Sequence, residues 1–335
     1  MNSSRVALIA CANGFGHVRR MLSLSLALRE QGASPVLIAP NEVVHRLAAT
    51  FGVQMPEVLD FKSRTTRADL LAPDAYGCWM DDMPVLDEFD EVVSDNLVEI
   101  LALRPQAWVS GSFFWHLALP GFPAAKAAYA EALLEQCRPR MISTGLFAAP
   151  YLASKTRLFT VGIYGLGPMV RAIDGVDLLV SCGRGGEVQA STRGLLRQLE
   201  SEAQPGLATV WVEPELYRPD MPDWMRPASY TPAMYGRLSA AVIRPGIGTV
   251  TDALLAGVRL FMFHEPDNLE MVQNARRLVA AGLGDACESP SQAWRAAMEF
   301  IATRQARDRH AASMRGLDCD GAAQAARLIL ADRFS

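Results

Sequence analysis

His17 combines a residue type and a position that suit a general base. It follows the loop Asn13-Gly14-Phe15-Gly16 and opens a helix that the spacing of apolar residues predicts up to Gln31. The positive end of a helix dipole disfavours the imidazolium form, so a histidine there stays neutral and can accept a proton from an acceptor hydroxyl. The alternative is a histidine that only caps the helix or forms a structural hydrogen bond. Gly14 and Gly16 belong to the same candidate site, because a glycine loop offers backbone amides beside the base.

Asp95 is the candidate for a carboxylate that orients this base. It ends the strand-like run Glu91 to Asp95, and the carboxyl ends of parallel strands gather at one edge of a sheet. A carboxylate in that place holds an imidazole and stabilises its charged form. Equally, Ser94-Asp95-Asn96 precedes a helical run and suits a helix N-cap. The segment Ala107 to Trp115 contains a further strand, and we assign Trp115 to the acceptor loop. His116, beside Trp115, is a weaker candidate for the base.

A second glycine-rich loop, Arg244-Pro245-Gly246-Ile247-Gly248-Thr249, suits a diphosphate. It lies between an apolar strand and a helix. Gly246 and Gly248 let the backbone approach an anion closely, and the helix N-terminus supplies free amides and a favourable dipole. Arg244 can neutralise phosphate oxygens, and Thr249 can donate a hydrogen bond to one of them. The loop therefore predicts a phosphate-binding site in the second half of the chain.

Four other polar residues extend this site to a whole nucleotide sugar. Asp252 can accept both hydroxyls of a ribose, or it can serve as favourable charge in the first helical turn. Arg184, in the other glycine-rich loop, is a second phosphate ligand or a surface arginine. Glu270 and Asn274 are four positions apart and share one helix face, so both can contact one sugar. The alternative for them is a polar loop followed by a capped helix.

The elements that position these residues form two series. Apolar strand-like runs alternate with helical periodicity, which favours parallel βαβ units, and the rhythm breaks near residues 150–172. The sequence predicts an α/β fold with Rossmann-like domains at 1–155 and 156–335, the last helix packing back on the first domain. Two such domains facing across a cleft bind ligands at the carboxyl ends of their strands. Residues 62–90 are expected to form loops and short helices over the cleft, or a solvated acidic surface.

The composition excludes several classes of protein. The formal net charge is −4, so the chain lacks the excess of basic residues that is typical of nucleic-acid-binding proteins. Six cysteines contain no CxxC pair, and no histidine cluster has metal-ligand spacing, so we expect free thiols in the cytoplasm, no metal and no cofactor. Arg19 replaces the third glycine of the dinucleotide fingerprint, which argues against NAD. No apolar window approaches the roughly 20 residues of a membrane helix, although peripheral membrane contact is compatible with the sequence.

Together these motifs resemble those of the GT-B glycosyltransferases. The loop Gly14 to Arg19 resembles their N-terminal GxGHxxR-type motif, and the segment Arg244 to Val258 resembles their donor-site motif. Asn274-Ala275 matches the asparagine–alanine pair that ends their sugar-binding segment. With the strand–helix rhythm, the similarity covers most of the chain. Within the superfamily the chain is most similar to the group that includes MurG and the macrolide-type UDP-glycosyltransferases.

The resemblance also implies roles for individual residues. It implies donor phosphate contacts at Arg244, Gly246, Gly248 and Thr249, a ribose contact at Asp252, and an acceptor-activating base at His17. Three positions depart from the family pattern: Asp252 replaces the usual glutamate, Glu270-Met271 replaces a common Asp-Gln pair, and Pro245 replaces a small residue. The donor sugar is therefore not identified. Residues 40–150 match no acceptor motif, so the acceptor is not identified either.

The predicted function is an inverting, metal-independent transfer of a sugar from a UDP- or dTDP-sugar to an acceptor hydroxyl or amine. His17 deprotonates the acceptor, Asp95 orients His17, and Arg244 with the helix dipole stabilises the leaving diphosphate. The alternatives on the same fold are a nucleotide-sugar hydrolase, a nucleotide-sugar epimerase and a non-catalytic nucleotide-sugar-binding partner subunit. The expected partners are a nucleotide sugar and an acceptor, with no nucleic acid. The sequence defines no oligomeric state.

Overall fold

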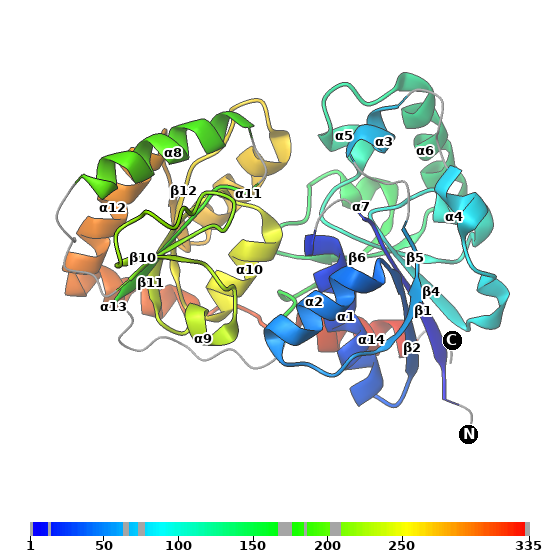
Figure 1. Ribbon diagram of the computed structural model, residues 1–335. Coiled ribbons are helices and arrows are strands. Elements are labelled where there is room, and N and C mark those ends of the chain that lie inside the picture. The colour runs from blue at the N-terminus through cyan, green and yellow to red at the C-terminus, as the bar shows by residue number, and fades with distance from the viewer. Residues whose placement is uncertain are drawn as a thin grey trace. The chain divides into compact units, whose positions relative to one another are not determined.

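The chain divides into two compact units in the computed structural model. Unit 1 comprises residues 1–167 and 318–335, and unit 2 comprises residues 168–317. Each unit is a parallel sheet with helices on both faces (Figure 1), which confirms the predicted two-domain α/β fold. The structure describes residues 3–12, 15–62, 67–72, 78–166, 176–183, 186–201 and 209–331.

The sheet of unit 1 has seven strands in the order β3-β2-β1-β4-β5-β6-β7. The strands are β1 (Arg5–Ala10), β2 (Ser34–Ala39), β3 (Glu57–Asp60), β4 (Glu91–Asp95), β5 (Trp108–Ser110), β6 (Arg140–Thr144) and β7 (Arg157–Val161). The central strands β1 and β4 pair in parallel, with Ala10 opposite Asp95. The two strands therefore end side by side, and whatever follows β1 lies beside the last residue of β4.

Helices cover both faces of this sheet. They are α1 (Phe15–Glu30), α2 (Asn41–Phe51), α3 (Arg67–Leu71), α4 (Ile100–Leu103), α5 (Trp115–Ala118), α6 (Ala124–Cys137), α7 (Leu152–Lys155) and α14 (Gly321–Ala331), with short 3₁₀ segments at Cys78–Asp82 and Leu86–Glu88. The helices α1, α2 and α14 pack on one face, and α4 and α6 pack on the other. Successive strand residues alternate between the two cores: Leu8 faces α1, whereas Ala7 and Ile9 face the opposite layer.

The division between the units differs from the expected boundary at residue 155. Strand β7 lies beyond that boundary, yet it pairs with β6 from Arg140↔Arg157 to Thr144↔Val161 and forms the edge of the first sheet. Helix α14 also belongs to unit 1, where Ala325, Ala326 and Ile329 are fully buried against its core. The sequence places the boundary before β7 because local composition does not show which sheet a strand joins; strand pairing decides that.

Unit 2 contains a six-stranded parallel sheet in the order β10-β9-β8-β11-β12-β13. Its strands are β8 (Asp177–Ser181), β9 (Val210–Val212), β10 (Met225–Pro227), β11 (Leu238–Ile243), β12 (Arg259–Met262) and β13 (Gly284–Ala286). Its helices are α8 (Gly186–Glu200), α9 (Pro232–Tyr235), α10 (Ile247–Leu255), α11 (Leu269–Ala280), α12 (Pro290–Ala302) and α13 (Arg304–Met314). Apolar residues of α8 and α12 pack against one face of the sheet.

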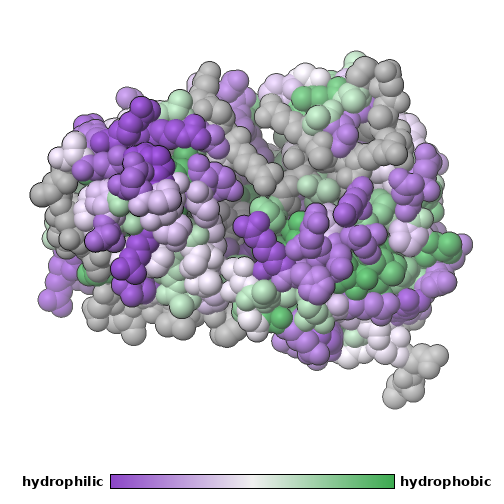
Figure 2. Space-filling model, in the orientation of Figure 1, coloured by the Kyte–Doolittle hydropathy of each residue, from purple (hydrophilic) through white to green (hydrophobic). Residues whose placement is uncertain are grey.

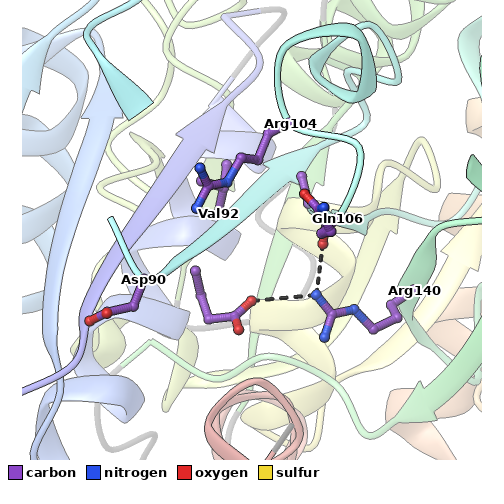
Figure 3. A pocket seen from close by; sticks show the side chains of 7 residues that line it. Asp90, Val92, Arg104, Gln106 and Arg140 are labelled. Atoms are coloured by element: carbon purple, nitrogen blue, oxygen red, sulfur yellow. Dashed lines mark hydrogen bonds and ion pairs between the residues drawn. The ribbon is translucent and has the colours of Figure 1, made fainter. Parts of the chain in front are cut away.

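A pocket of about 360 Å³ lies at the amino ends of β4, β5 and β6 in unit 1 (Figure 3). Arg140 is one of its polar lining residues: Nη2 donates a hydrogen bond to Gln106 O at 2.7 Å and lies 3.5 Å from Glu91 Oε2. Glu91 begins β4, whereas Asp95 ends it. The pocket therefore lies at the edge of the sheet opposite to the candidate catalytic residues.

The face of the molecule seen in Figure 2 is largely hydrophilic. Figure 2 shows hydrophilic residues over much of the visible face, with apolar residues between them. The large apolar side chains that are most exposed, Val85, Leu269, Leu103 and Val176, lie far apart in the chain. Within the described ranges, no helix is long and apolar enough to cross a membrane.

Candidate active site

His17 and Asp95 meet at the carboxyl edge of the first sheet. The helix α1 follows β1, and the strand order reverses between β1 and β4, whose connections lead to opposite sides of the sheet. Such a switch point leaves a crevice beyond the strand ends. His17, in the first turn of α1, places Nδ1 2.6 Å from Asp95 Oδ2. The structure thus brings together the two residues that the sequence proposed as base and orienting carboxylate.

Asp95 is held as a buried side chain at the end of β4. Its side chain is fully buried, so its negative charge requires partners inside the protein. The alternative role as an N-cap is wrong, because α4 begins only at Ile100 and has Glu99 at its N-cap position. The residues after β4 turn sharply instead: Asn96 has φ +59°, a conformation that asparagine tolerates better than most residues.

Arg20 is a third member of this cluster, and the sequence reasoning missed it. Its Nε lies 2.9 Å from Asp95 Oδ1, and its Nη2 lies 3.2 Å from Oδ2 and 3.4 Å from His17 Nδ1. The positive charge of the Arg20 guanidinium therefore compensates the negative charge of the buried Asp95 carboxylate, which also contacts His17. Arg20 is three positions after His17 on the same helix, and this spacing was the sequence signal that could have identified it.

Tyr164 is a buried neighbour of this cluster. Burial raises the pKa of its hydroxyl, which stays protonated at neutral pH.

The second nitrogen of His17 is available for proton transfer. When Nδ1 donates its hydrogen to Asp95, the lone pair belongs to Nε2. Within the described chain, Nε2 has no hydrogen-bond partner, and the side chain is 11% exposed. A partly accessible neutral imidazole backed by a carboxylate can remove a proton from a bound hydroxyl.

Trp115 lies beside this histidine. The ring centroids of Trp115 and His17 are 5.7 Å apart, and those of Trp115 and Phe113 are 4.9 Å apart. The backbone before it is fixed by Asn96, whose amide nitrogen, with the amide suitably oriented, lies 3.2 Å from Ser110 O and 3.1 Å from Phe113 O. The predicted acceptor-loop residue is therefore adjacent to the predicted base.

His116, the weaker base candidate, points into a different environment. Its side chain is 2% exposed, and its Nε2 lies 2.9 Å from Glu131 Oε1. Lys155 Nζ donates to the other oxygen of Glu131 at 2.5 Å. Burial lowers the pKa of His116, although Glu131 acts in the opposite direction. The cluster joins α5, α6 and α7, so His116 holds the segment that carries Trp115.

In unit 2 the corresponding switch point lies between β8 and β11. Arg244 directly follows β11, and a Cβ atom at Gly183, in the loop after β8, would lie 4.0 Å from Arg244 Nη1. The guanidinium thus extends from one loop toward the other. Gly246 is the N-cap of α10, and a Cβ atom there would meet nothing within 4 Å. The predicted phosphate loop is therefore at a sheet edge that suits ligand binding.

The N-terminus of α10 carries three free amides. Within the described chain, the N–H groups of Ile247, Gly248 and Thr249 make no hydrogen bond, whereas Val250 N donates to Gly246 O at 3.1 Å. Free amides in the first helical turn, together with the helix dipole, attract an anion. Gly246, Gly248 and Thr249 thus lie at the N-terminus of a helix, which is the arrangement that the sequence analysis expected for a phosphate loop.

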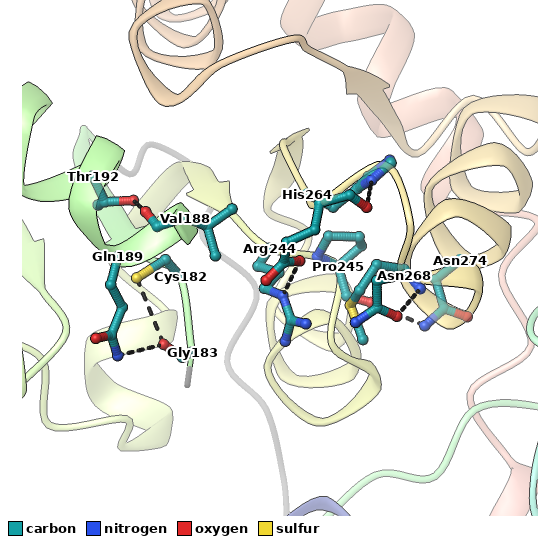
Figure 4. A network of polar contacts seen from close by, with 12 residues as sticks. Cys182, Gly183, Val188, Gln189, Thr192, Arg244, Pro245, His264, Asn268 and Asn274 are labelled. Atoms are coloured by element: carbon teal, nitrogen blue, oxygen red, sulfur yellow. Dashed lines mark hydrogen bonds and ion pairs between the residues drawn. The ribbon is translucent and has the colours of Figure 1, made fainter. Parts of the chain in front are cut away.

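Two side chains from neighbouring elements support this loop (Figure 4). Glu265, which follows β12, accepts a hydrogen bond from Arg244 Nε at 2.9 Å. Asn274 Nδ2, on α11, donates to Pro245 O at 3.0 Å, and Asn274 is only 1% exposed. The predicted sugar contact Asn274 therefore fixes the backbone of the phosphate loop. The sequence shows Glu265 only as one of several polar residues after a strand; that it pairs with Arg244 depends on β11 and β12 being neighbours.

The remaining predicted residues of the donor site and of the acceptor loop are placed as follows. Asp252 lies within α10 and is 5% exposed, and Glu270 lies in the first turn of α11. Gly16 lies in the first turn of α1. Gly14 and Arg184 are outside the described residues.

A carboxylate that the sequence reasoning did not single out fills the loop after β8. Glu213 Oε2 accepts hydrogen bonds from Cys182 N at 2.7 Å and from Gly183 N at 2.8 Å. Successive backbone amides of this kind form an anion site, and here the protein's own side chain occupies it. Burial also raises the pKa of the Cys182 thiol to about 12, so it is not a nucleophile at neutral pH. Within the described part of unit 2, the amides at the start of α10 are free and suit a phosphate.

Comparison with known proteins identifies the fold. No protein-family model matches the sequence, and no curated protein matches it significantly. Solved structures match along the whole chain. CalG4, the calicheamicin glycosyltransferase, is 20% identical with a TM-score of 0.64, and the match covers 100% of both chains. The chain has the GT-B fold.

Two further structures with this GT-B fold contain nucleotides. LpCGTa, in complex with UDP, is 16% identical with a TM-score of 0.67, and the match covers 99% of each chain. The glycosyltransferase VinC, in complex with dTDP, is 15% identical with a TM-score of 0.62, and the match covers 98% of this chain and 100% of VinC. The GT-B topology accounts for the two sheets and for the switch point in each. The fold that the sequence motifs implied is confirmed.

Proposed function

We propose that this protein is an inverting glycosyltransferase that moves a sugar from a UDP- or dTDP-sugar to an acceptor hydroxyl or amine. The observation that carries the proposal is the 2.6 Å contact between His17 and the buried Asp95, on a fold shared with glycosyltransferases along the whole chain. His17 Nε2 accepts the proton of the acceptor, whose oxygen or nitrogen then attacks the anomeric carbon from the face opposite the diphosphate. Asp95 stabilises the imidazolium that forms.

Unit 2 supplies the donor site in this proposal. The free amides at the start of α10 and the cation of Arg244 bind the diphosphate and stabilise its charge as it leaves. These groups perform the charge stabilisation without a metal ion. Asp252 and Glu270 are the proposed ribose and sugar contacts. UDP and dTDP are the proposed nucleotides because LpCGTa and VinC, which share the fold, were determined in complex with them.

The cytoplasm is the proposed location. Cys11, Cys137, Cys182, Cys287 and Cys319 are all free thiols in the described chain. Free thiols on a protein of this size fit a reducing compartment.

The first test is nucleotide binding, measured by thermal shift with UDP, dTDP, GDP, CDP and ADP. A ligand at about 100 times its dissociation constant stabilises the folded protein by about 2.7 kcal/mol. We expect UDP or dTDP to raise the melting temperature selectively, and Arg244→Gln to remove most of that shift. No shift with any of the five nucleotides would contradict the donor site and with it the proposed function.

The second test separates transfer from hydrolysis. A panel of sugars linked to the selected nucleotide is incubated with and without candidate acceptors, and release of the nucleoside diphosphate is measured. Transfer predicts fast release only when an acceptor is present. Equal release of the nucleoside diphosphate without any acceptor would identify a hydrolase, in which His17 deprotonates water instead of an acceptor.

A further inference from the structure

Arg244 presents two different edges to its surroundings. On one edge, Nε lies 2.9 Å from Glu265 Oε2, in an ion pair whose side chains are 18% and 14% exposed. On the other edge, the two Nη nitrogens have no hydrogen-bond partner among the described residues. The cation of Arg244 is therefore partly compensated before any ligand binds, while the four N–H donors of its two Nη nitrogens are unpaired within the described part of the chain.

The position of Glu265 is built into the sheet. The strands β11 and β12 pair with Ile243 opposite Met262, so the residues that follow them lie at the same edge. The carbonyl oxygen of Glu265 also accepts a hydrogen bond from Asn268 N at 3.3 Å and lies 3.0 Å from His264 Nδ1. Figure 4 shows Arg244 between the loop at Gly183 and the segment that carries His264 and Asn268. Strand pairing and these backbone contacts thus fix the position of Glu265, and its carboxylate lies beside Arg244 as a result.

We propose that Glu265 sets the affinity of the donor site by sharing Arg244 with the diphosphate. This inference rests on the proposed function, in which Arg244 binds that diphosphate. Through Nε, the carboxylate fixes the plane of the guanidinium and leaves the Nη edge for phosphate oxygens. At the same time its negative charge offsets the cation and repels the diphosphate. A transferase must release a nucleoside diphosphate after every transfer, and a partly compensated arginine releases it faster than an uncompensated one.

The two effects of Glu265 are separable by substitution. In Glu265→Gln the amide oxygen still accepts the hydrogen bond from Arg244 Nε, so the orientation is kept while the charge is lost. We expect this variant to bind UDP or dTDP about tenfold more tightly than the unmodified protein. In Glu265→Ala both the charge and the orientation are lost, so its affinity gain is smaller than that of Glu265→Gln. Because the effect of Glu265→Gln is electrostatic, it shrinks as salt screens the charges.

The experiment is isothermal titration calorimetry of the full chain with UDP and with dTDP, at about 0.05 M and about 0.5 M NaCl. The variants are Glu265→Gln and Glu265→Ala. Glu299→Gln is the matched control, because it removes the same charge from an exposed position on α12 of the same unit. The expected result is tighter binding by Glu265→Gln at low salt, a smaller gap at high salt, and no change for Glu299→Gln.

The possible outcomes separate this inference from the proposed function. If the unmodified protein binds UDP or dTDP and Glu265→Gln binds it equally or more weakly, the affinity-setting role of Glu265 is wrong and the proposed function stands. That role is also wrong if the gain persists unchanged at high salt or appears equally in Glu299→Gln. If the unmodified protein binds neither nucleotide, the proposed function itself fails, and this inference fails with it.

Discussion

The contact of 2.6 Å between His17 Nδ1 and Asp95 Oδ2 joins the first turn of α1 to the last residue of β4. These residues are 78 positions apart in the sequence. They meet because β1 and β4 are neighbours and end in register, with Ala10 opposite Asp95. The contact engages Nδ1 and leaves Nε2, on a side chain that is 11% exposed, as the nitrogen that can accept a proton.

Replacing Asp95 by asparagine tests this contact. Asp95→Asn keeps the shape of the side chain but removes the negative charge that stabilises an imidazolium. We expect turnover to fall by about 10²–10⁴, the range for loss of general-base assistance. The dissociation constant for UDP should stay unchanged, because the phosphate loop belongs to unit 2. Release of the nucleoside diphosphate in a transfer assay gives the first quantity, and calorimetry gives the second.

Asp87→Asn is the control for this variant. Asp87 lies in the same unit, and its side chain is 89% exposed in an ion pair with Arg104, so its removal should leave turnover intact. Full turnover by Asp95→Asn would remove Asp95 from its proposed role.

The sequence alone was enough to propose His17, Asp95 and Arg244 as site residues, because a loop or strand end at a βα junction is a local pattern. It was not enough to predict their partners. Glu265 was not predicted to pair with Arg244, since that pairing requires knowing that β11 and β12 are adjacent. Glu213 was missed for the same reason: it fills a loop that follows β8, the strand next to its own.

Loss of the Asn274 side chain should loosen the phosphate loop. Asn274→Ala leaves Pro245 O without its buried donor, at a cost of about 1–3 kcal/mol. We expect UDP or dTDP affinity to fall by about tenfold, because the free amides of α10 follow directly after Pro245. Calorimetry with the selected nucleotide measures the change.

Asn268→Ala provides a matched comparison on the same helix. Asn268 accepts a hydrogen bond from Met271 N as the N-cap of α11, so its loss costs about 1 kcal/mol of stability. Its side chain bonds Met271 N and not Pro245 O. Equal loss of nucleotide affinity in both variants would show that Asn274 acts only through the stability of α11.

The fold could be predicted where the periodicity was strong. The last helix was expected to pack on the first domain, and α14 does so; the strand at 91–95 is also as expected. No element was predicted for the region that holds α6, because its many alanines spread apolar character around the whole helix and hide the amphipathic period. The edge strand β3 was also missed, since Glu57–Asp60 is short and only partly buried.

Gly111 should tolerate no side chain. Its φ is +152°, and a Cβ atom there would collide with the terminal amide of Asn96. Gly111→Ala must therefore displace Asn96, which bridges to Ser110 O and Phe113 O and directly follows Asp95. We expect a loss of about 3 kcal/mol or more in the free energy of unfolding, as for an overpacked core with added backbone strain. Chemical denaturation of both proteins measures the difference.

Gly52→Ala separates strain from collision. Gly52, after α2, has φ +65°, but a Cβ atom there meets nothing within 4 Å. This control should lose only about 1 kcal/mol, the cost of a left-handed conformation for an alanine. Similar losses in the two variants would mean that the contact with Asn96 is not what requires glycine at position 111.

His310 should make unit 2 sensitive to acid. It lies on α13, is 5% exposed, and its Nε2 lies 3.0 Å from Gly257 O, while Nδ1 is buried without a partner in the described part of the chain. Burial, with a smaller effect of Arg259, lowers its pKa from 6.5 to about 4, although Asp285 acts in the opposite direction. The unfolded chain therefore binds a proton between pH 6.5 and 4 that the folded chain does not. Stability is complete above pH 6.5 and falls as the pH drops to 4, by roughly 3 kcal/mol.

The variant His310→Gln isolates this effect from the carboxylates that titrate in the same range. Its amide can donate to Gly257 O but does not titrate, so the stabilisation of the neutral histidine is absent at every pH. Urea unfolding of both proteins is measured at pH 7, 5.5 and 4.5. The unmodified protein should lose more stability than the variant over this range. The carboxylates titrate in both proteins, but only the unmodified protein has a histidine at position 310 that takes up a proton on unfolding. Parallel losses in the two proteins would show that protonation of His310 is not coupled to unfolding.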